Sequence, residues 1–175
     1  MLCALESTSN HEANKQILAI FPHDSQLSHY PIFVESLENV RFVKVSYGDL
    51  IRNCGRGMSE LWDSGKLQAS EFYHRSVFPV CTKIKTTRSF LFFSHLSDVL
   101  RQCLLFRVGG RYLDSDVVTL TNFPENPRNF IVVARRSKLS SSVLQFERGH
   151  GFLESSIELM VKIHISILTQ GFNFA

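Results

Sequence analysis

The stretch "GGRYLDSDVV", residues 109 to 118, places two carboxylates, Asp114 and Asp116, in an otherwise apolar segment. In an extended backbone, side chains two positions apart point to the same side, so both acids would face one spot. Two like charges held close together are unfavourable unless a positive group lies between them. The stretch therefore predicts a strand, near 112–120, that presents its two acids to a cation.

Residues 94–108, which precede this stretch, show the clearest helical pattern of the chain. Ser94 is placed to cap the helix, and Gly109 fits the left-handed position at which many helices end. Its polar stripe carries Asp98, Arg101 and Gln102 at helical spacing. After a tight turn at the glycines, Asp98 and Arg101 would reach the ligand of a cation bound by the two acids. An exposed ion pair without a functional role is the alternative.

The rest of the chain alternates between helical and strand patterns, which is typical of an α/β layer fold. Helices are expected at residues 3–13, 59–66 and 152–168, and strands at 16–21, 40–46, 130–135 and 142–147. Ser59 is placed to cap the second helix, and Gly65 to end it. Residues 74–93 have poor periodicity and fit either an extra strand or a loop insertion, and the sequence leaves both open.

Composition excludes several classes of protein. The chain has 175 residues, 44% of them apolar and 20% charged, which is ordinary for a globular domain with a substantial core. The net charge of +3 comes without a dense Lys/Arg stripe, so we expect no nucleic-acid partner. The four cysteines form no C-x-x-C pair, which argues against a zinc site. We interpret them as buried small apolar residues; a disulfide is an open alternative whose pairing the spacing does not assign.

Two carboxylates at this spacing offer hard oxygen ligands, which suit Mg²⁺ or Mn²⁺ with water or substrate phosphates in the remaining positions. A solvated turn that happens to carry two acids is the plain alternative. A third reading is the D-x-D-x-[TV] pattern of phosphatases that use aspartate as the nucleophile. Those enzymes need a long buried strand before the first acid, and here Tyr112 and Leu113 directly follow two glycines and an arginine.

The string "HLSDVLRQCLLFRVGGRYLDSDVVTL", residues 95 to 120, resembles the core motif of a family of D-x-D sugar transferases. This is the lactosylceramide α-1,4-galactosyltransferase and α-1,4-N-acetylglucosaminyltransferase family, whose pattern is S-D-x-x-R, a helix, then G-G-x-Y-x-D-x-D. The matching residues are Ser97, Asp98, Arg101, Gly109, Gly110, Tyr112, Asp114 and Asp116. Weaker similarities to the family lie in "CALESTSNHEAN", in "LWDSGK" and in "VLQFERGHGFLE".

The resemblance implies a GT-A fold, a Rossmann-like α/β sheet that binds a nucleotide sugar. It implies a retaining transferase that moves a hexose or N-acetylhexosamine from a UDP-sugar to a galactose-ended glycolipid or glycan. Asp114 and Asp116 would hold Mn²⁺ (or Mg²⁺) against the UDP diphosphate, where the metal acts as a Lewis acid. Asp98 and Arg101 would bind hydroxyls of the donor sugar, and Tyr112 would line the donor pocket. The donor sugar stays open among galactose, N-acetylgalactosamine and N-acetylglucosamine.

The resemblance also suggests how the chain is divided. Residues 1–122 would form the nucleotide-sugar-binding region, with 74–93 as a candidate insertion, and 123–175 would begin an acceptor-side region. In the family a strand precedes the first helix and an acceptor-side segment follows the last, so we expect the fold to be incomplete at both ends. Golgi localisation and membrane association are expected of the full-length family member. The alternative is a truncated or decayed, non-catalytic relative that keeps the nucleotide-sugar motif.

Three other side chains have a functional and a structural reading. Trp62 would stack on the uracil ring or pack in the core. His95, at the start of the predicted helix, would touch substrate or serve as a polar group of the first turn. His150 follows Gly149 in a predicted turn, where we expect a structural role.

Overall fold

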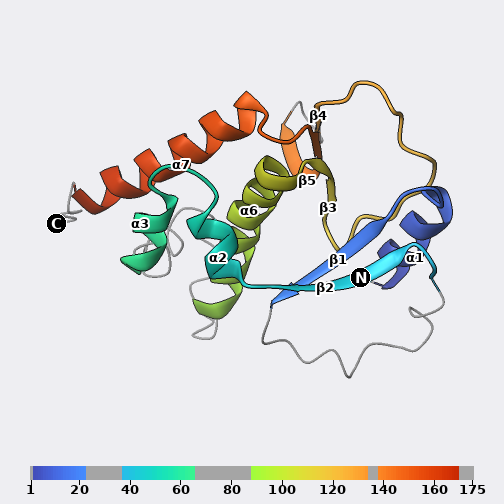
Figure 1. Ribbon diagram of the computed structural model, residues 1–175, viewed down its shortest axis with the longest axis horizontal. Coiled ribbons are helices and arrows are strands. Elements are labelled where there is room, and N and C mark those ends of the chain that lie inside the picture. The colour runs from blue at the N-terminus through green and yellow to red at the C-terminus, as the bar shows by residue number, and fades with distance from the viewer. Residues whose placement is uncertain (1, 23–36, 66–87, 134–137, 170–175) are drawn as a thin grey trace. The chain divides into compact units, whose positions relative to one another are not determined.

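The computed structural model of the chain describes residues 2–22, 37–65, 88–133 and 138–169 (Figure 1). Helices and parallel and antiparallel strand pairs occur together in these residues, so the predicted α/β class is confirmed. Within the described ranges, no helix is both long enough and apolar enough to cross a membrane.

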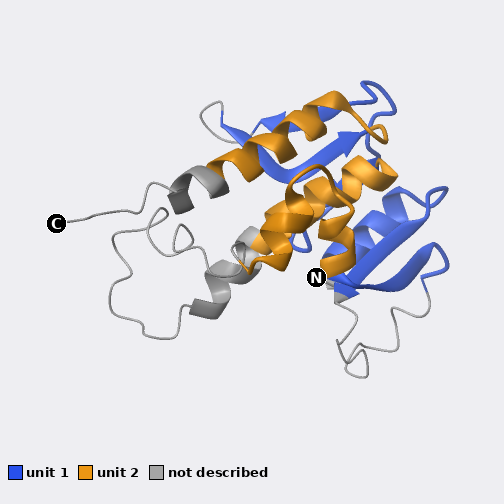
Figure 2. Cartoon of the chain, turned by 60° about the vertical axis from the view of Figure 1, so that its left-hand side comes forward, with its two compact units in different colours: residues 1–47, 110–146 blue, residues 48–109, 147–175 orange. Residues whose placement is uncertain are grey.

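The chain folds into two compact units, each assembled from two separate stretches of sequence (Figure 2). Unit 1 comprises residues 1–47 and 110–146, and unit 2 comprises residues 48–109 and 147–175. One of the three points at which the chain passes between the units falls between Gly109 and Gly110, inside the segment that links the predicted donor helix to the acids. The division at residue 122 into a donor region and an acceptor region concerns function and stays a prediction.

One sheet of unit 1 is a parallel pair, β1 (Ile17–Pro22) and β2 (Val40–Val45), paired from Ile17↔Val40 onward. Ala19 and Phe21 are buried in β1, which also contacts helix α1 (Leu2–His11). These three elements match the predictions at 3–13, 16–21 and 40–46 to within two residues. Periodicity succeeds here because it records which face of each element is buried.

The end of α1 is joined to the start of β2 by the side chain of Asn39. Its Nδ2 donates to the carbonyls of Ser9, Glu12 and Lys15, at 3.3, 3.1 and 3.2 Å. Ser9 Oγ in turn donates to Asn39 Oδ1. Ser9 lies in the last turn of α1, where carbonyls have no partner within the helix, so the Asn39 amide supplies one there.

The second sheet of unit 1 is antiparallel, with the order β3 (Gly110–Leu113), β5 (Leu139–Phe146), β4 (Phe130–Val133). The central strand, β5, contributes Val143, Leu144 and Phe146 to the core. Two motifs of the resemblance meet in this sheet, because "GRYL" of β3 pairs with "VLQF" of β5. The predicted strands at 130–135 and 142–147 are present, the second starting three residues earlier than expected.

The strand predicted near 112–120 is wrong beyond its first residues, because β3 ends at Leu113. The chain then turns, and the Val117 amide donates to the Asp114 carbonyl at 3.0 Å. Asp and Ser favour such turns because their short polar side chains compete with the sheet for backbone hydrogen bonds. The two acids therefore lie on a turn that follows the strand and not on the strand itself.

Unit 2 is helical. It contains α2 (Tyr47–Arg52), α3 (Met58–Asp63), α6 (Arg88–Val108) and α7 (Gly151–Thr169), and α7 packs against both α3 and α6. Among its described residues, the fully buried apolar side chains include Ile51, Met58, Leu105, Leu153 and Ile157. The helix predicted at 152–168 is confirmed, whereas α2 was not predicted.

Two predicted helix caps are wrong. Ser94 lies inside α6, which begins at Arg88, so the backbone upstream is already helical and needs no cap there. The remainder of the 74–93 stretch, residues 74–87, lies outside the described residues. Gly57 is the N-cap residue of α3, and Ser59 sits in the helix with its Oγ 3.1 Å from Asp63 Oδ2. Gly65 does follow the helix end with a φ of +68°, as predicted.

The structure assigns the disulfide that the sequence left open, and it corrects the interpretation of the cysteines as buried residues at Cys3. Cys54, in the loop after α2, forms a disulfide with Cys103 of α6, and both side chains are fully buried. Cys3 is an exposed free thiol, and Cys81 lies outside the described residues. The disulfide ties the loop between α2 and α3 to the helix that carries Asp98 and Arg101.

Candidate functional site

Asp114 and Asp116 occupy the turn that follows β3, and hydrogen bonds hold Asp114 from two directions. Its amide donates to the carbonyl of Ser142 in β5 at 2.9 Å, which extends the strand pairing by one residue. Tyr112 Oη donates to Asp114 Oδ1 at 2.8 Å. The first acid of the motif is thus held in place by β3 and β5.

The two acids differ in exposure. Asp114 is half-buried, whereas Asp116 is exposed. Because the backbone turns between them, the two side chains are not aligned on one side as they would be on a strand, and the turn determines where they point. Carboxylate oxygens on an accessible turn fit Mn²⁺ or Mg²⁺, which bind through one or two carboxylates and take other oxygens from substrate phosphates. In the described ranges, no three His, Cys, Asp or Glu side chains gather into a metal-binding group.

Asp98 and Arg101 lie on α6, in unit 2, and form an ion pair with Arg101 Nη2 3.1 Å from Asp98 Oδ1. The Arg101 side chain is 6% exposed and that of Asp98 is 43% exposed. Arg101 Nη2 also donates to Ser97 Oγ at 3.1 Å. A buried guanidinium needs such partners, so the reading of a wholly solvent-exposed ion pair is wrong for Arg101.

Gln102, the third member of the predicted polar stripe, is only partly exposed. Its Oε1 is buried and has no hydrogen-bond partner among the residues that the structure describes. The polar stripe of α6 is therefore partly covered on the side of Arg101 and Gln102. The sequence pattern did not reveal this burial, because polar residues in an amphipathic helix are assigned to its solvent-facing side.

Four of the five predicted site residues form two pairs, one hydrogen-bonded and one an ion pair, each within its own unit. Tyr112 and Asp114 are joined in unit 1, next to Asp116, and Asp98 and Arg101 are joined in unit 2. The hydrogen bond between Tyr112 and Asp114 was not predicted. The ion pair on α6 follows from the i,i+3 spacing, as expected.

The two glycines between α6 and β3 are required for different reasons. Gly109 has a φ of +74°, and a Cβ built there would lie 2.7 Å from the backbone nitrogen of Arg148. Gly110 has a φ of +99° and begins β3, where it pairs with Phe146. Other residues rarely adopt these angles, so the Gly-Gly pair lets a helix end and a strand begin within two residues.

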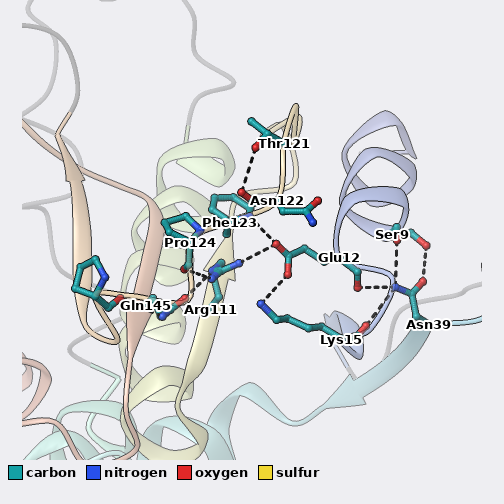
Figure 3. A network of polar contacts seen from close by, with 11 residues as sticks. Ser9, Glu12, Lys15, Asn39, Arg111, Thr121, Asn122, Phe123, Pro124 and Gln145 are labelled. Carbon is teal, nitrogen blue, oxygen red and sulfur yellow. Dashed lines mark hydrogen bonds and ion pairs between the residues drawn. The ribbon is translucent and has the colours of Figure 1, made fainter.

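A buried polar network that sequence reasoning missed surrounds the start of β3 (Figure 3). Glu12, just after α1, contacts Lys15, Arg111 and the backbone amide of Phe123. The Arg111 guanidinium lies 4.2 Å from the centre of the Phe123 ring, and its Nε donates to Gln145 Oε1 at 2.7 Å. The signal available in the sequence was a charged residue, Arg111, directly before the predicted strand near 112–120.

The network changes the acidity of Glu12 and Arg111. Burial is the largest influence on Glu12 and acts to raise its pKa. The hydrogen bonds from Lys15 and Phe123, with the charges of Lys15 and Arg111, outweigh it and lower the pKa below the ordinary value. Burial lowers the pKa of Arg111, against the opposing effect of Glu12.

The segment that follows the acids is also attached to α1. Thr119 is buried, and its Oγ1 lies 2.8 Å from Thr8 Oγ1. The Thr119 amide donates to Ser7 Oγ at 3.0 Å. The "CALEST" part of the resemblance therefore contacts the segment that carries Asp114 and Asp116, an arrangement that spacing along the chain did not reveal.

Of the other candidates, His150 has the predicted structural role. Its Nδ1 accepts a hydrogen bond from the Phe152 amide at 3.2 Å, which caps the start of α7. Trp62 lies against Gly48, where an added Cβ would be 3.0 Å from Trp62 Nε1. The side chain of His95 is outside the described part of the structure.

A cavity of about 300 Å³ lies in unit 2, beside the disulfide. It is lined by Cys54, Arg56, Phe106, Glu154 and Ile157, among others. None of the five predicted site residues lines it, so the site rests on the residues described above and not on this cavity.

Comparison with known proteins gives one family match and several partial relatives. Residues 3–132 match the family described as the glycosyltransferase sugar-binding region containing the DXD motif, a range that includes all five predicted site residues. The chain is 43% identical over 58 residues to lactosylceramide 4-alpha-galactosyltransferase from Rattus norvegicus and to its counterpart from Mus musculus. It is 40% identical over 58 residues to the protein of that name from Gorilla gorilla gorilla.

These relatives are matched over a limited segment. The aligned residues cover 33% of this chain and 16–17% of each relative. No solved structure matches the chain.

Proposed function

Because the chain belongs to the family of glycosyltransferases whose sugar-binding region contains the DXD motif, we propose that it binds a UDP-sugar through that motif. The proposed reaction transfers a hexose or N-acetylhexosamine to a galactose-ended glycolipid or glycan, with retention of the α configuration. A GT-A arrangement of the complete protein is part of this proposal. The relatives named as lactosylceramide 4-alpha-galactosyltransferases support a glycolipid acceptor.

The observation that carries the proposal is the turn after β3. It presents one hydrogen-bonded acid, Asp114, and one exposed acid, Asp116, directly after the Gly-Gly pair of the motif. A divalent cation, Mn²⁺ or Mg²⁺, held by these carboxylates would supply Lewis acidity toward the diphosphate of the leaving UDP. Tyr112 orients Asp114 through its hydroxyl and, in the proposal, also lines the donor pocket.

Asp98 and Arg101 are proposed to bind the donor sugar. Arg101 is buried and pairs with Asp98, which holds that carboxylate in one orientation. The Asp98 side chain is 43% exposed, so its oxygens are accessible to sugar hydroxyls, which are good donors to a carboxylate. In this arrangement Arg101 positions Asp98 and adds positive charge close to the bound sugar.

A Golgi lumenal setting is proposed for the protein. The buried disulfide between Cys54 and Cys103 supports an oxidising compartment, since cytosolic conditions keep most thiols reduced. Mass spectrometry of the protein isolated from cells under non-reducing conditions would contradict this placement if both cysteines carried free thiols.

Calorimetric titration with UDP, with Mn²⁺ and then with EDTA, tests the proposed site. Without a cation, the two acids and the diphosphate repel one another, so affinity is expected to fall sharply in EDTA. Equal affinity in both conditions would overturn the role of the acids. A screen of UDP-galactose, UDP-N-acetylgalactosamine and UDP-N-acetylglucosamine would then identify the donor. Cation-dependent binding without transfer to any galactose-ended acceptor would favour a non-catalytic relative.

A further inference from the structure

The segment that carries the two acids is held at both of its ends by one oxygen atom. Glu12 Oε1 lies 3.4 Å from Arg111 Nη1, in the strand before the acids, and accepts from the Phe123 amide, after them, at 2.7 Å (Figure 3). We propose that Glu12 is a positioning residue that fixes this segment for binding of the cation and diphosphate. The inference rests on the proposed function and adds a residue that lies outside the motif.

The contact with Arg111 differs from an ordinary surface ion pair. The side chains of Glu12 and Arg111 are 6% and 13% exposed, so water screens their attraction little. Arg111 is also fixed by Gln145 and by the ring of Phe123. A buried charge pair with further hydrogen bonds has one favourable geometry, which suits it to hold two segments of backbone in fixed relative positions.

Glu12 is itself anchored on the opposite side. Its backbone carbonyl accepts from Asn39 Nδ2 at 3.1 Å, at the start of β2. The carboxylate therefore connects the segment 111–123 to the junction of α1 and β2. Movement of that segment would require breaking contacts to Oε1, even where the Tyr112–Asp114 hydrogen bond stays intact.

The two oxygens of Glu12 provide an internal comparison. Oε1 forms an ion pair with Arg111 and accepts a hydrogen bond from the Phe123 amide, whereas Oε2 forms an ion pair with Lys15 Nζ at 2.8 Å. Lys15 lies outside the segment that carries the acids. A change at Lys15 therefore removes a charge from the same network but leaves both contacts to the segment in place.

The experiment compares three variants of the full chain, Glu12→Gln, Arg111→Gln and Lys15→Gln. Affinity for UDP in Mn²⁺ is measured by calorimetry, and amide hydrogen exchange is measured over residues 114–123. Glu12→Gln is isosteric but removes the charge, and Arg111→Gln tests the same link from its other side if the first variant does not fold. Phe21→Leu, in the buried face of β1, controls for a general loss of stability.

We expect Glu12→Gln and Arg111→Gln to weaken UDP binding about 10–100-fold, the range typical of residues that orient ligands from outside the first contact layer. Exchange at the Phe123 amide is expected to rise in Glu12→Gln, because its acceptor becomes neutral. Lys15→Gln and Phe21→Leu are expected to stay within about twofold of the parent affinity, a change worth less than 0.5 kcal/mol by the usual conversion.

Unchanged affinity and exchange in both Glu12→Gln and Arg111→Gln would overturn the positioning role. Equal loss in Lys15→Gln or Phe21→Leu would also overturn it, since the effect would then reflect charge or stability in general. If the parent chain itself shows no cation-dependent UDP binding, the proposed function fails. In that case the exchange data decide whether Glu12 holds the segment.

Discussion

Tyr112 Oη, on strand β3, donates a hydrogen bond of 2.8 Å to Oδ1 of Asp114, the first acid of the motif. This contact fixes a carboxylate that would otherwise rotate about its side-chain bonds. We predict that Tyr112→Phe lowers the affinity for UDP in Mn²⁺ while costing about 1 kcal/mol of unfolding free energy. Calorimetry and urea denaturation measure the two effects, and an unaltered affinity would show that the hydroxyl does not orient Asp114.

The pair on α6 can be separated from an ordinary surface ion pair by its ligands. Asp98→Ala is expected to weaken UDP-sugar binding more than UDP binding, because the sugar hydroxyls lose an acceptor. Asp49→Ala is the matched control, since Asp49 and Arg52 form an i,i+3 pair in which both side chains are well exposed. The control should leave both affinities unchanged. If Asp98→Ala weakens both ligands equally, the contact with the sugar is wrong.

The disulfide should contribute strongly to stability. The bridge between Cys54 and Cys103 closes a sequence separation of 49 residues, and both side chains are fully buried. The double variant Cys54→Ala, Cys103→Ala is expected to lose about 2–5 kcal/mol of unfolding free energy. Denaturation with and without a reductant measures this loss, with Cys3→Ala as the exposed control. A parent chain that is insensitive to reductant would contradict the prediction.

Gly109 should tolerate no side chain. Its φ of +74° is unfavourable for other residues, and a Cβ would lie 2.7 Å from the Arg148 backbone nitrogen. Gly109→Ala is expected to cost at least about 1–3 kcal/mol from backbone strain, before the steric contact is counted. Gly151→Ala is the control, because a Cβ there meets no atom within 4 Å. Similar denaturation midpoints for the two variants would contradict the geometry at Gly109.

Acid should weaken the Glu12 network. Because interactions with Lys15, Phe123 and Arg111 lower the pKa of Glu12 in the folded state, its stabilising effect is present above the unfolded pKa, about 4.3. That effect is lost as the pH falls from about 5 through the lower, folded pKa. Glu12→Gln should therefore be less stable than the parent at pH 7, with the difference shrinking below about pH 4.

Unfolding free energies measured by urea between pH 7 and pH 3 test this dependence. The control is Glu38→Gln, at an exposed glutamate of the same unit. A constant difference between the parent and Glu12→Gln across this pH range would mean that the charge of Glu12 does not stabilise the fold.

The predictions from the sequence agree best with the structure where the position of a helix or strand is set by the residues within it. The helix at 152–168 and the strands at 16–21 and 40–46 lie close to where periodicity predicts them. Gly109 ends α6 in the left-handed conformation, as predicted. Spacing of apolar side chains and the angles open to glycine are local properties, so a single chain reveals them.

For the candidate site, the sequence by itself determined which residue types stand at which spacing: Asp98, Arg101, Tyr112, Asp114 and Asp116, within a range that matches the glycosyltransferase family. Tertiary structure decided that the acids leave the strand after Leu113, that Cys54 pairs with Cys103, and that Arg101 is buried. It also brought Glu12 to Arg111 across 99 residues of chain. Burial and pairing between distant segments depend on how the elements pack, and no local pattern of residues specifies that packing.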